Sequence, residues 1–309
     1  MKRNFSNHSS EKKFSTISDI ERIKGRFFVI GCVRSGTTLL QSIIASHPQL
    51  QSFPESHFFR YIYSDGWRRR AGLANKKGIL RLKQFIEDCK YSHLHHLIPK
   101  YNLFADTYAK SFIKILDTIT HNNENEYWIE KTPSHLYNIN DIEKYVNNAK
   151  FIHIIRNGED VIASLFEATR DNPDVWNGAR SIEVCVKRWK KDIEISKNFE
   201  NKKNHFIVNY NELVNNTEYL IKEICAFLEI EFDHKMICEK NNSANDIILD
   251  FESWKKNTTN KIAKSKIRKF NIIFTKSERQ FIRSKLKSNI TNPAKSSNGL
   301  FGKSDTYQK

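Results

Sequence analysis

The chain has 309 residues, 39% hydrophobic and 28% charged, with a net charge of +16. This composition excludes collagen-like, coiled-coil and wholly disordered chains, and no apolar run approaches the roughly 18 residues that a membrane-spanning helix needs. The first 24 residues lack the apolar core of a secretory signal, and the five scattered cysteines fit neither a disulfide framework nor a zinc knuckle. These features predict a cytoplasmic protein without integral membrane association. The positive charge favours an anionic partner.

The apolar pattern predicts one domain over residues 25–290, between a basic arm at 1–24 and a polar tail at 291–309. Strands are expected at residues 27–30, 127–129, 151–155 and 206–208. Helices are expected at residues 37–46, 136–146, 159–168, 182–199 and 217–228. This alternation predicts an α/β fold of three layers, with a central parallel sheet flanked by helices. Residues 60–125 are expected to form a mostly helical insertion that faces the substrate.

The first predicted strand runs into a glycine-containing loop and then a helix, an arrangement in which backbone N–H groups bind an anion. Gly31 and Gly36 have the spacing of a Walker A loop, which makes the expected fold P-loop-like, but Thr37 stands where that loop carries its lysine. The missing lysine disfavours an ordinary ATPase. Other groups suit a small anion, namely the guanidinium of Arg34 and the hydroxyls of Ser35, Thr37 and Thr38. The alternative interpretation is a simple glycine turn.

This loop resembles the 5′-phosphosulfate loop of the sulfotransferases that use 3′-phosphoadenosine 5′-phosphosulfate (PAPS). The bacterial branch similar to tyrosylprotein sulfotransferases is especially close. The resemblance is carried by Arg34, Ser35, Gly36, Thr37 and Thr38. It implies that the loop binds the 5′ end of PAPS.

A second strand-to-helix passage, residues 151–165, resembles the 3′-phosphate motif of the same family. Arg156 ends the strand, and Ser164 follows about two helical turns later, so both side chains can converge on one phosphate dianion. Alternatively, Arg156 pairs with Asp160 or Glu159, and Ser164 is a small residue that packs between helices.

Sulfuryl transfer to a hydroxyl needs a base for the acceptor proton and positive charge at the leaving oxygen. The resemblance places the base at Glu55 and assigns the leaving oxygen to Lys131, which follows a buried strand. Glu130 is expected to face away from Lys131 because neighbouring strand residues point to opposite faces. Glu55 has the alternative of a helix N-terminal charge. His57 and His135 are alternative bases.

Two later segments are also similar to family motifs. Tyr210 corresponds to a strand-end tyrosine that helps to bind the nucleotide, with packing at the sheet edge as the alternative. Ser265 and Lys269 keep anion-binding chemistry in a segment where the family carries a serine, a glycine and a tryptophan. Here Arg268 replaces the glycine and Phe270 the tryptophan. A further departure is Ala168, where the tyrosylprotein branch has an arginine, which Arg170 could replace.

The leading hypothesis is a PAPS-dependent sulfotransferase that needs no metal and acts on a hydroxyl, for which we favour a carbohydrate or glycan precursor. His93, His95 and His96 are interpreted as solvated surface rather than metal ligands. One rival is a kinase-like P-loop enzyme, which would require Mg²⁺. Another is a basic nucleic-acid-binding module, although basic and aromatic residues do not interleave in a recognisable motif.

Overall fold

A computed structural model of the protein describes residues 23–63, 66–238 and 269–287. Its centre is a five-stranded sheet made of β1 (Gly25–Gly31), β2 (Leu50–Phe53), β3 (Tyr127–Lys131), β4 (Ala149–Ile155) and β5 (His205–Asn209). All neighbouring strands pair in parallel, in the order β2-β3-β1-β4-β5. The apolar run Phe27–Ile30 is buried in central β1, as expected for a sheet covered on both faces. The predicted parallel sheet is confirmed.

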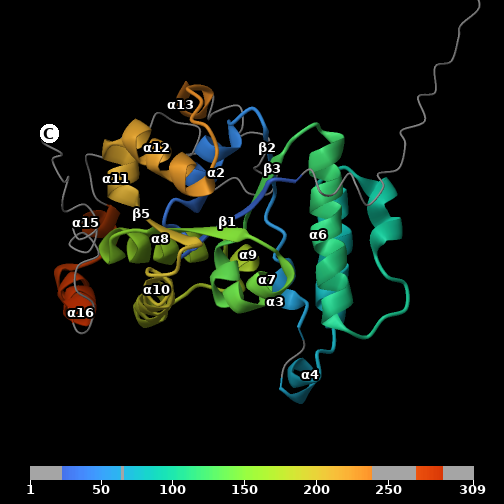
Figure 1. Ribbon diagram of the computed structural model, residues 1–309. Coiled ribbons are helices and arrows are strands. Elements are labelled where there is room, and N and C mark those ends of the chain that lie inside the picture. Colours follow the sequence, from blue (N-terminus) through green and yellow to red (C-terminus); the bar gives the residue numbers. More distant parts are fainter. Residues whose placement is uncertain (1–22, 64–65, 239–268, 288–309) are drawn as a thin grey trace, which may run out of the picture.

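The sheet separates two apolar clusters, because successive side chains of β1 point to opposite faces. Phe28 and Ile30 belong to one cluster, and Phe27 and Val29 to the other. The first face is covered by α3 (Phe58–Tyr61), α5 (Lys76–Asp88), α6 (Ala105–Asn122), η2 (Pro133–Tyr137) and α7 (Ile139–Tyr145). The second is covered by α2 (Thr37–Ala45), α11 (Tyr210–Asn215), α12 (Thr217–Leu228) and α13 (Lys235–Cys238). Figure 1 shows the resulting three layers.

A third apolar cluster gathers around Ile155, at the end of β4, and Cys32, just after β1. It joins α8 (Gly158–Asp171) and α10 (Ile182–Lys197) to the last two helices described, α15 (Lys269–Ile273) and α16 (Lys276–Lys287). Short α9 (Pro173–Trp176) follows α8. In Figure 1 the red C-terminal helices lie beside α8 and α10. The described C-terminal residues therefore complete the layer that carries the predicted 3′-phosphate motif.

Some elements differ from the prediction. Strand β2 is not among the expected strands, because it is an edge strand with only Leu50 and Phe53 buried and its apolar signal is weak. The helix expected at residues 136–146 is divided into η2 and α7, which meet at Asn138. The helical insertion follows β2 and also includes α4 (Trp67–Arg70) and η1 (Ser92–Leu97). No helix within the described ranges is long and apolar enough to cross a membrane.

The parallel topology places every strand's carboxyl end at the same edge of the sheet. Residues that follow different strands therefore meet there despite their distance in sequence. Lys131 ends β3, Arg156 follows β4, Tyr210 follows β5, and Glu55 follows β2 by two residues. The loop after β1 lies between them, because β1 is the central strand.

Candidate active site

The loop between β1 and α2 turns sharply enough to aim its backbone at a small anion. Arg34 and Gly36 both have positive φ angles, 71° and 100°. The amide of Ser35 donates a hydrogen bond to the carbonyl of Cys32 at 3.2 Å. Helix α2 begins at Thr37 without a side-chain cap, and the buried Ser35 hydroxyl has no hydrogen-bond partner among the described residues. An uncapped helix N-terminus beside an unpaired hydroxyl is suited to binding an anion.

Gly36 and Tyr210 lie against each other, which joins the first loop to the end of β5. A Cβ atom on Gly36 would lie 2.5 Å from the Tyr210 ring, so only glycine allows this contact. On the ring of Tyr210 lies the Arg156 guanidinium, with its Cζ atom 4.1 Å from the ring centroid. The structure thus stacks Gly36, Tyr210 and Arg156, which sequence reasoning took from three separate motifs.

Arg34 reaches across to the second motif. Its Nε donates a hydrogen bond to the Ser164 hydroxyl at 3.1 Å. Burial lowers the pKa of Arg34; the Glu167 carboxylate opposes this shift, and the positive charge of Arg156 adds to it. Two arginines that repel each other at a partly buried edge favour a ligand with negative charge.

Arg156 keeps hydrogen-bonding capacity at this edge. Its Nε lies 3.8 Å from the Asp160 carboxylate, so the predicted alternative pair forms only as a long contact. The buried Nε has no hydrogen-bond partner among the described residues. The Arg156 backbone is held by Trp189, whose indole N–H donates to the Arg156 carbonyl at 3.0 Å. The backbone of Arg156 is therefore held in place, and its guanidinium can still bind a phosphate oxygen.

Glu55 and Lys131 form a direct ion pair at the end of β3. The Lys131 side chain is 1% exposed and that of Glu55 is 14% exposed. The second Glu55 oxygen lies 3.4 Å from Nε2 of His57, whose pKa is lowered by burial despite the opposing effect of Glu55. His57 is thus a neutral imidazole beside the carboxylate. The two residues assigned by resemblance to the base and the leaving oxygen are in contact.

Glu130 occupies a different environment from Lys131, its neighbour in β3. Its buried carboxylate accepts hydrogen bonds from the Ser56 amide at 3.1 Å, the Ser56 hydroxyl at 2.8 Å and the Thr132 hydroxyl at 2.6 Å. It also pairs with Nδ1 of His135 at 3.0 Å. Glu130 therefore joins the loop that carries Glu55 to the end of β3. His135 is engaged in the same cluster through its contact with Glu130.

Replacement of Glu130 by alanine is expected to lower the free energy of unfolding by about 3 kcal/mol, because it leaves several buried donors unpaired. Urea denaturation measures this loss. The matched control Glu194→Ala, at an exposed position of α10, should change stability by less than about 0.5 kcal/mol. Equal effects of the two substitutions would contradict the role of Glu130 as the acceptor of several buried hydrogen bonds.

The stability provided by Glu130 should also depend on pH. Burial by itself raises its pKa, but His135, Thr132 and Ser56 outweigh burial and lower it. A lowered carboxyl pKa stabilises the fold above the ordinary glutamate value of about 4.3, and this stability is lost as the pH falls through the folded-state pKa. Wild-type stability should therefore decrease at acidic pH more steeply than that of Glu130→Gln.

Arg81 is a site residue that the sequence analysis missed. It lies on α5, and its guanidinium donates to the backbone carbonyls of Glu55 at 3.3 Å and Ser56 at 3.4 Å. It therefore supports the loop from the side of the insertion. Nothing in the sequence around Arg81 distinguishes it from other basic residues on an amphipathic helix.

The C-terminal motif is only partly described. Ser265 and Arg268 lie outside the described residues. Lys269 begins α15 and pairs with Glu167, the carboxylate that acts on Arg34. Phe270 is buried against Phe274, so its ring is part of the core. Arg170 is exposed, and its guanidinium lies over the ring of Phe166.

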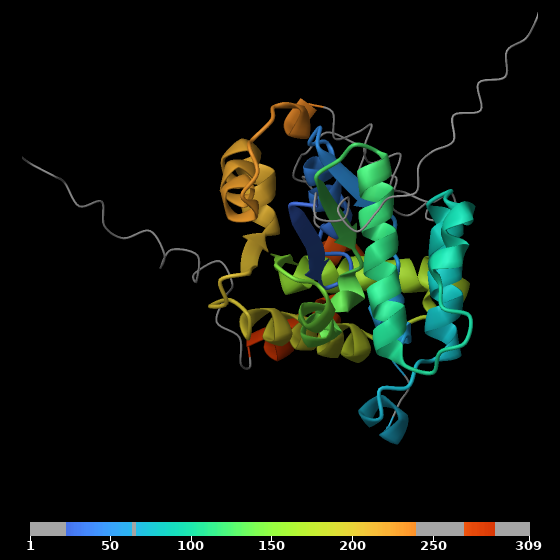
Figure 2. The ribbon, with the colours of Figure 1, turned by 45° about the vertical axis from the view of Figure 1, so that its right-hand side comes forward.

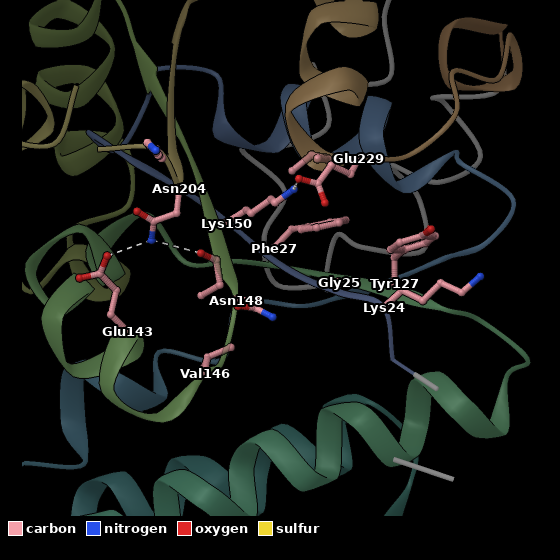
Figure 3. Close-up of a pocket in the computed structure, with 13 residues that line it drawn as sticks. Lys24, Gly25, Phe27, Tyr127, Glu143, Val146, Asn148, Lys150, Asn204 and Glu229 are labelled. Carbon is pink, nitrogen blue, oxygen red and sulfur yellow. Dashed lines mark hydrogen bonds and ion pairs between the residues drawn. The ribbon is translucent and has the colours of Figure 1, made fainter. Parts of the chain in front are cut away.

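A hollow of about 750 Å³ lies at the opposite edge of the sheet. Its lining includes Gly25, Tyr127 and Ala149, the first residues of β1, β3 and β4. Lys150 and Glu229, which also line the hollow and lie next to each other in Figure 3, form an ion pair at 3.0 Å. Because the candidate site follows the carboxyl ends of the strands, this hollow is separate from it.

Within the part of the chain that the structure describes, no group of three or more histidine, cysteine, aspartate or glutamate residues is arranged to bind a metal ion. His95 pairs with Glu87 at 2.5 Å, and Nδ1 of His96 contacts the His93 carbonyl. These contacts place the three histidines in ordinary surface interactions.

Two solved sulfotransferase domains have a fold similar to that of this chain. The fold is similar to the sulfotransferase domain from the curacin biosynthetic pathway, with a TM-score of 0.57 and 22% identity, over 86% of this chain and 99% of that one. It is also similar to the sulfotransferase domain from the Synechococcus PCC 7002 olefin synthase, with a TM-score of 0.51 and 18% identity, over 86% and 95% of the chains.

Sequence comparison gives the family. A Caenorhabditis briggsae protein, provisionally named a protein-tyrosine sulfotransferase, is 24% identical over 225 residues, which are 72% of this chain and 70% of that protein. The model of the sulfotransferase family matches residues 26–234, more than half of the 309 residues. The chain therefore belongs to the sulfotransferase family.

Proposed function

We propose that this protein transfers a sulfuryl group from PAPS to a hydroxyl group of a carbohydrate or glycan precursor. The proposal rests on two groups of residues that lie together at one edge of the sheet. One is the anion-binding group formed by the loop after β1, Arg156 and Ser164. The other is the buried Glu55–Lys131 pair.

The chemistry of these residues fits the donor nucleotide. PAPS carries a 3′-phosphate and a 5′-phosphosulfate, so it needs positive charge and hydrogen-bond donors in two places. Arg156 and Ser164 are assigned to the 3′-phosphate, and the loop from Arg34 to Thr38 to the 5′ end. The Ser35 hydroxyl and Arg156 Nε supply donors that have no hydrogen-bond partner among the described residues. Tyr210 supports Arg156 through its ring face.

The donor, when bound, supplies the sulfuryl group: the acceptor oxygen forms its bond to sulfur as the bond from sulfur to the 5′-phosphate oxygen breaks in line, and 3′-phosphoadenosine 5′-phosphate leaves. Glu55 takes the acceptor proton, and Lys131 neutralises the charge that develops on the leaving oxygen. The two side chains already form an ion pair in the free protein. Because His57 is neutral and adjacent, it remains the alternative proton acceptor.

The choice of a carbohydrate acceptor is supported by the polar surroundings of Glu55. His57 and Arg81 contact the carboxylate or its backbone. Such groups can hydrogen-bond to the hydroxyls that neighbour the reacting one in a sugar. Sulfation of sugars should therefore exceed sulfation of simple phenols when labelled PAPS is offered with both.

Calorimetric titration in EDTA tests the donor site. We expect 3′-phosphoadenosine 5′-phosphate (PAP) to bind without metal, and 5′-AMP to bind about 100-fold more weakly because it lacks the charge-assisted hydrogen bonds of the 3′-phosphate. A preference for ATP once Mg²⁺ is added would contradict the proposal and favour a kinase-like enzyme.

A further inference from the structure

The insertion carries an exposed aromatic and basic surface that the proposed reaction does not use. We define the aromatic–arginine surface as Trp67, Arg68, Arg70, Tyr101, Leu103 and Phe104. Its four large apolar side chains are 63% (Trp67), 97% (Tyr101), 73% (Leu103) and 53% (Phe104) exposed. Exposed apolar groups concentrated in this way indicate an interaction site.

The two segments that form this surface are joined by backbone contacts. The amide of Ala74 donates to the Leu103 carbonyl at 2.7 Å, and that of Ala105 donates to the Gly72 carbonyl at 2.8 Å. Leu73 and Phe104 also form an isolated antiparallel bridge. The residues on either side of α4 and those before α6 therefore form one structure.

Helix α4 is also held to the body of the protein. Arg69 forms an ion pair with Asp141 of α7 at 2.7 Å, and its guanidinium lies over the Tyr63 ring. Arg69 is engaged in these two contacts. The side chains that remain exposed around it are Trp67, Arg68 and Arg70. Figure 2 shows α4 projecting beyond the neighbouring helices.

The aromatic–arginine surface lies on the same side of the fold as the candidate site. Helix α6 packs against β3 and leads into it through a short turn, so the two run in opposite directions. The start of α6, at Ala105, therefore lies toward the end of β3, where Lys131 is found. Both segments of the surface are attached there.

The charge around these apolar groups is mainly positive, although Asp65 stands just before the first segment and Asp106 just after the second. Residues 66–77 contain three arginines and two lysines and no acidic residue, and residues 98–105 contain one lysine and no acidic residue. The nearby carboxylate of Asp141 is paired with Arg69, and that of Asp106 is paired with Lys144 and Tyr145. The surface therefore complements a partner with negative charge.

We propose that the aromatic–arginine surface binds the face of a membrane that contains anionic lipids. Tryptophan and tyrosine favour the interface between lipid and water, and arginines beside them pair with anionic headgroups. Leu103 and Phe104 add apolar contact with the acyl region. A membrane suits a projecting convex surface, because lipids adapt to its shape. Binding in this orientation brings the candidate site toward acceptors carried on lipids.

Flotation with vesicles tests this inference independently of sulfuryl transfer. The full chain should bind vesicles of phosphatidylglycerol and phosphatidylcholine, bind phosphatidylcholine alone much more weakly, and dissociate as salt is raised. The double variant Arg68→Gln/Arg70→Gln should bind the anionic vesicles about 30-fold more weakly. Its control, Lys83→Gln/Lys187→Gln, removes two exposed charges elsewhere and should retain much more of the binding.

A second pair of variants tests the contribution of the apolar side chains to vesicle binding. Trp67→Ser/Leu103→Ser should weaken vesicle binding about tenfold or more, whereas Tyr219→Ser/Val184→Ser, which removes exposed apolar groups elsewhere, should not. Circular dichroism confirms that each variant is folded. Equal binding by variants and controls, or no binding to anionic vesicles, overturns the proposal. The proposal would also be overturned if the wild-type protein formed a dimer and did not bind vesicles, and only Trp67→Ser/Leu103→Ser dissociated that dimer. The surface would then mediate self-association.

Discussion

Loss of the Lys131 ammonium group is expected to reduce sulfuryl transfer about 1000-fold, because a buried positive charge at the leaving oxygen acts mainly in the transition state. Glu55→Gln should reduce the rate by about 100-fold or more, since the amide cannot accept the proton. In both variants the affinity for PAP should stay within about threefold of wild type, because Glu55 is assigned to the acceptor and Lys131 to a single oxygen of the 5′-phosphate, which the loop from Arg34 to Thr38 also binds. Turnover of labelled PAPS and calorimetry with PAP measure the two quantities.

The control for Lys131→Ala is Lys150→Ala. Lys150 also belongs to a strand of the sheet and forms an ion pair, with Glu229, but it lies at the opposite edge. Its removal should leave turnover nearly unchanged. Lys131→Met provides a second test, because it keeps most of the buried side chain and removes only the charge. Retained turnover in Lys131→Met, or weakening of PAP binding as severe as that caused by Arg156→Ala, would exclude the proposed role.

Replacement of Arg156 by alanine should weaken PAP binding about 100-fold, because it removes charge-assisted hydrogen bonds to a phosphate dianion. The maximum rate at saturating PAPS should change much less, since the acceptor proton and the leaving oxygen are assigned to Glu55 and Lys131 and not to Arg156. Calorimetry measures the affinity, and initial rates at high PAPS measure turnover.

Arg180 offers the comparison for Arg156. It is also an arginine beside an aromatic ring, that of Trp176, and it is also only partly buried, but it follows α9 rather than a strand of the sheet. Arg180→Ala should change PAP affinity by less than about threefold. If PAP binds equally well to Arg156→Ala and Arg180→Ala, the 3′-phosphate must be bound by other residues.

The sequence determined the parts of the fold that depend on local pattern. The apolar runs at residues 27–30 and 151–155 indicated buried strands, and the helical period indicated the helices between them, because burial on both faces leaves a strong hydrophobic signal. Edge strand β2 was missed because half of its four residues are only partly buried. The break at Asn138 was missed because the apolar residues on either side continue one pattern.

The sequence also indicated which residues belong to the candidate site, through motifs in which each residue follows a strand. It did not show their contacts. The contact of Gly36 with Tyr210 and the hydrogen bond from Arg34 to Ser164 join the loop after β1 to segments more than 100 residues away, and Arg156 stacks on the same Tyr210 ring. Only the order of the parallel strands decides which strand ends are neighbours.

Tertiary structure alone also separated residues with similar local patterns. Glu55 and Glu130 are both carboxylates near Lys131, but one forms an ion pair with it and the other binds Ser56, Thr132 and His135. Arg81 reaches the same loop from the helical insertion. Local sequence determines the residues available to the protein, whereas long-range packing determines which of their charges and hydrogen bonds meet.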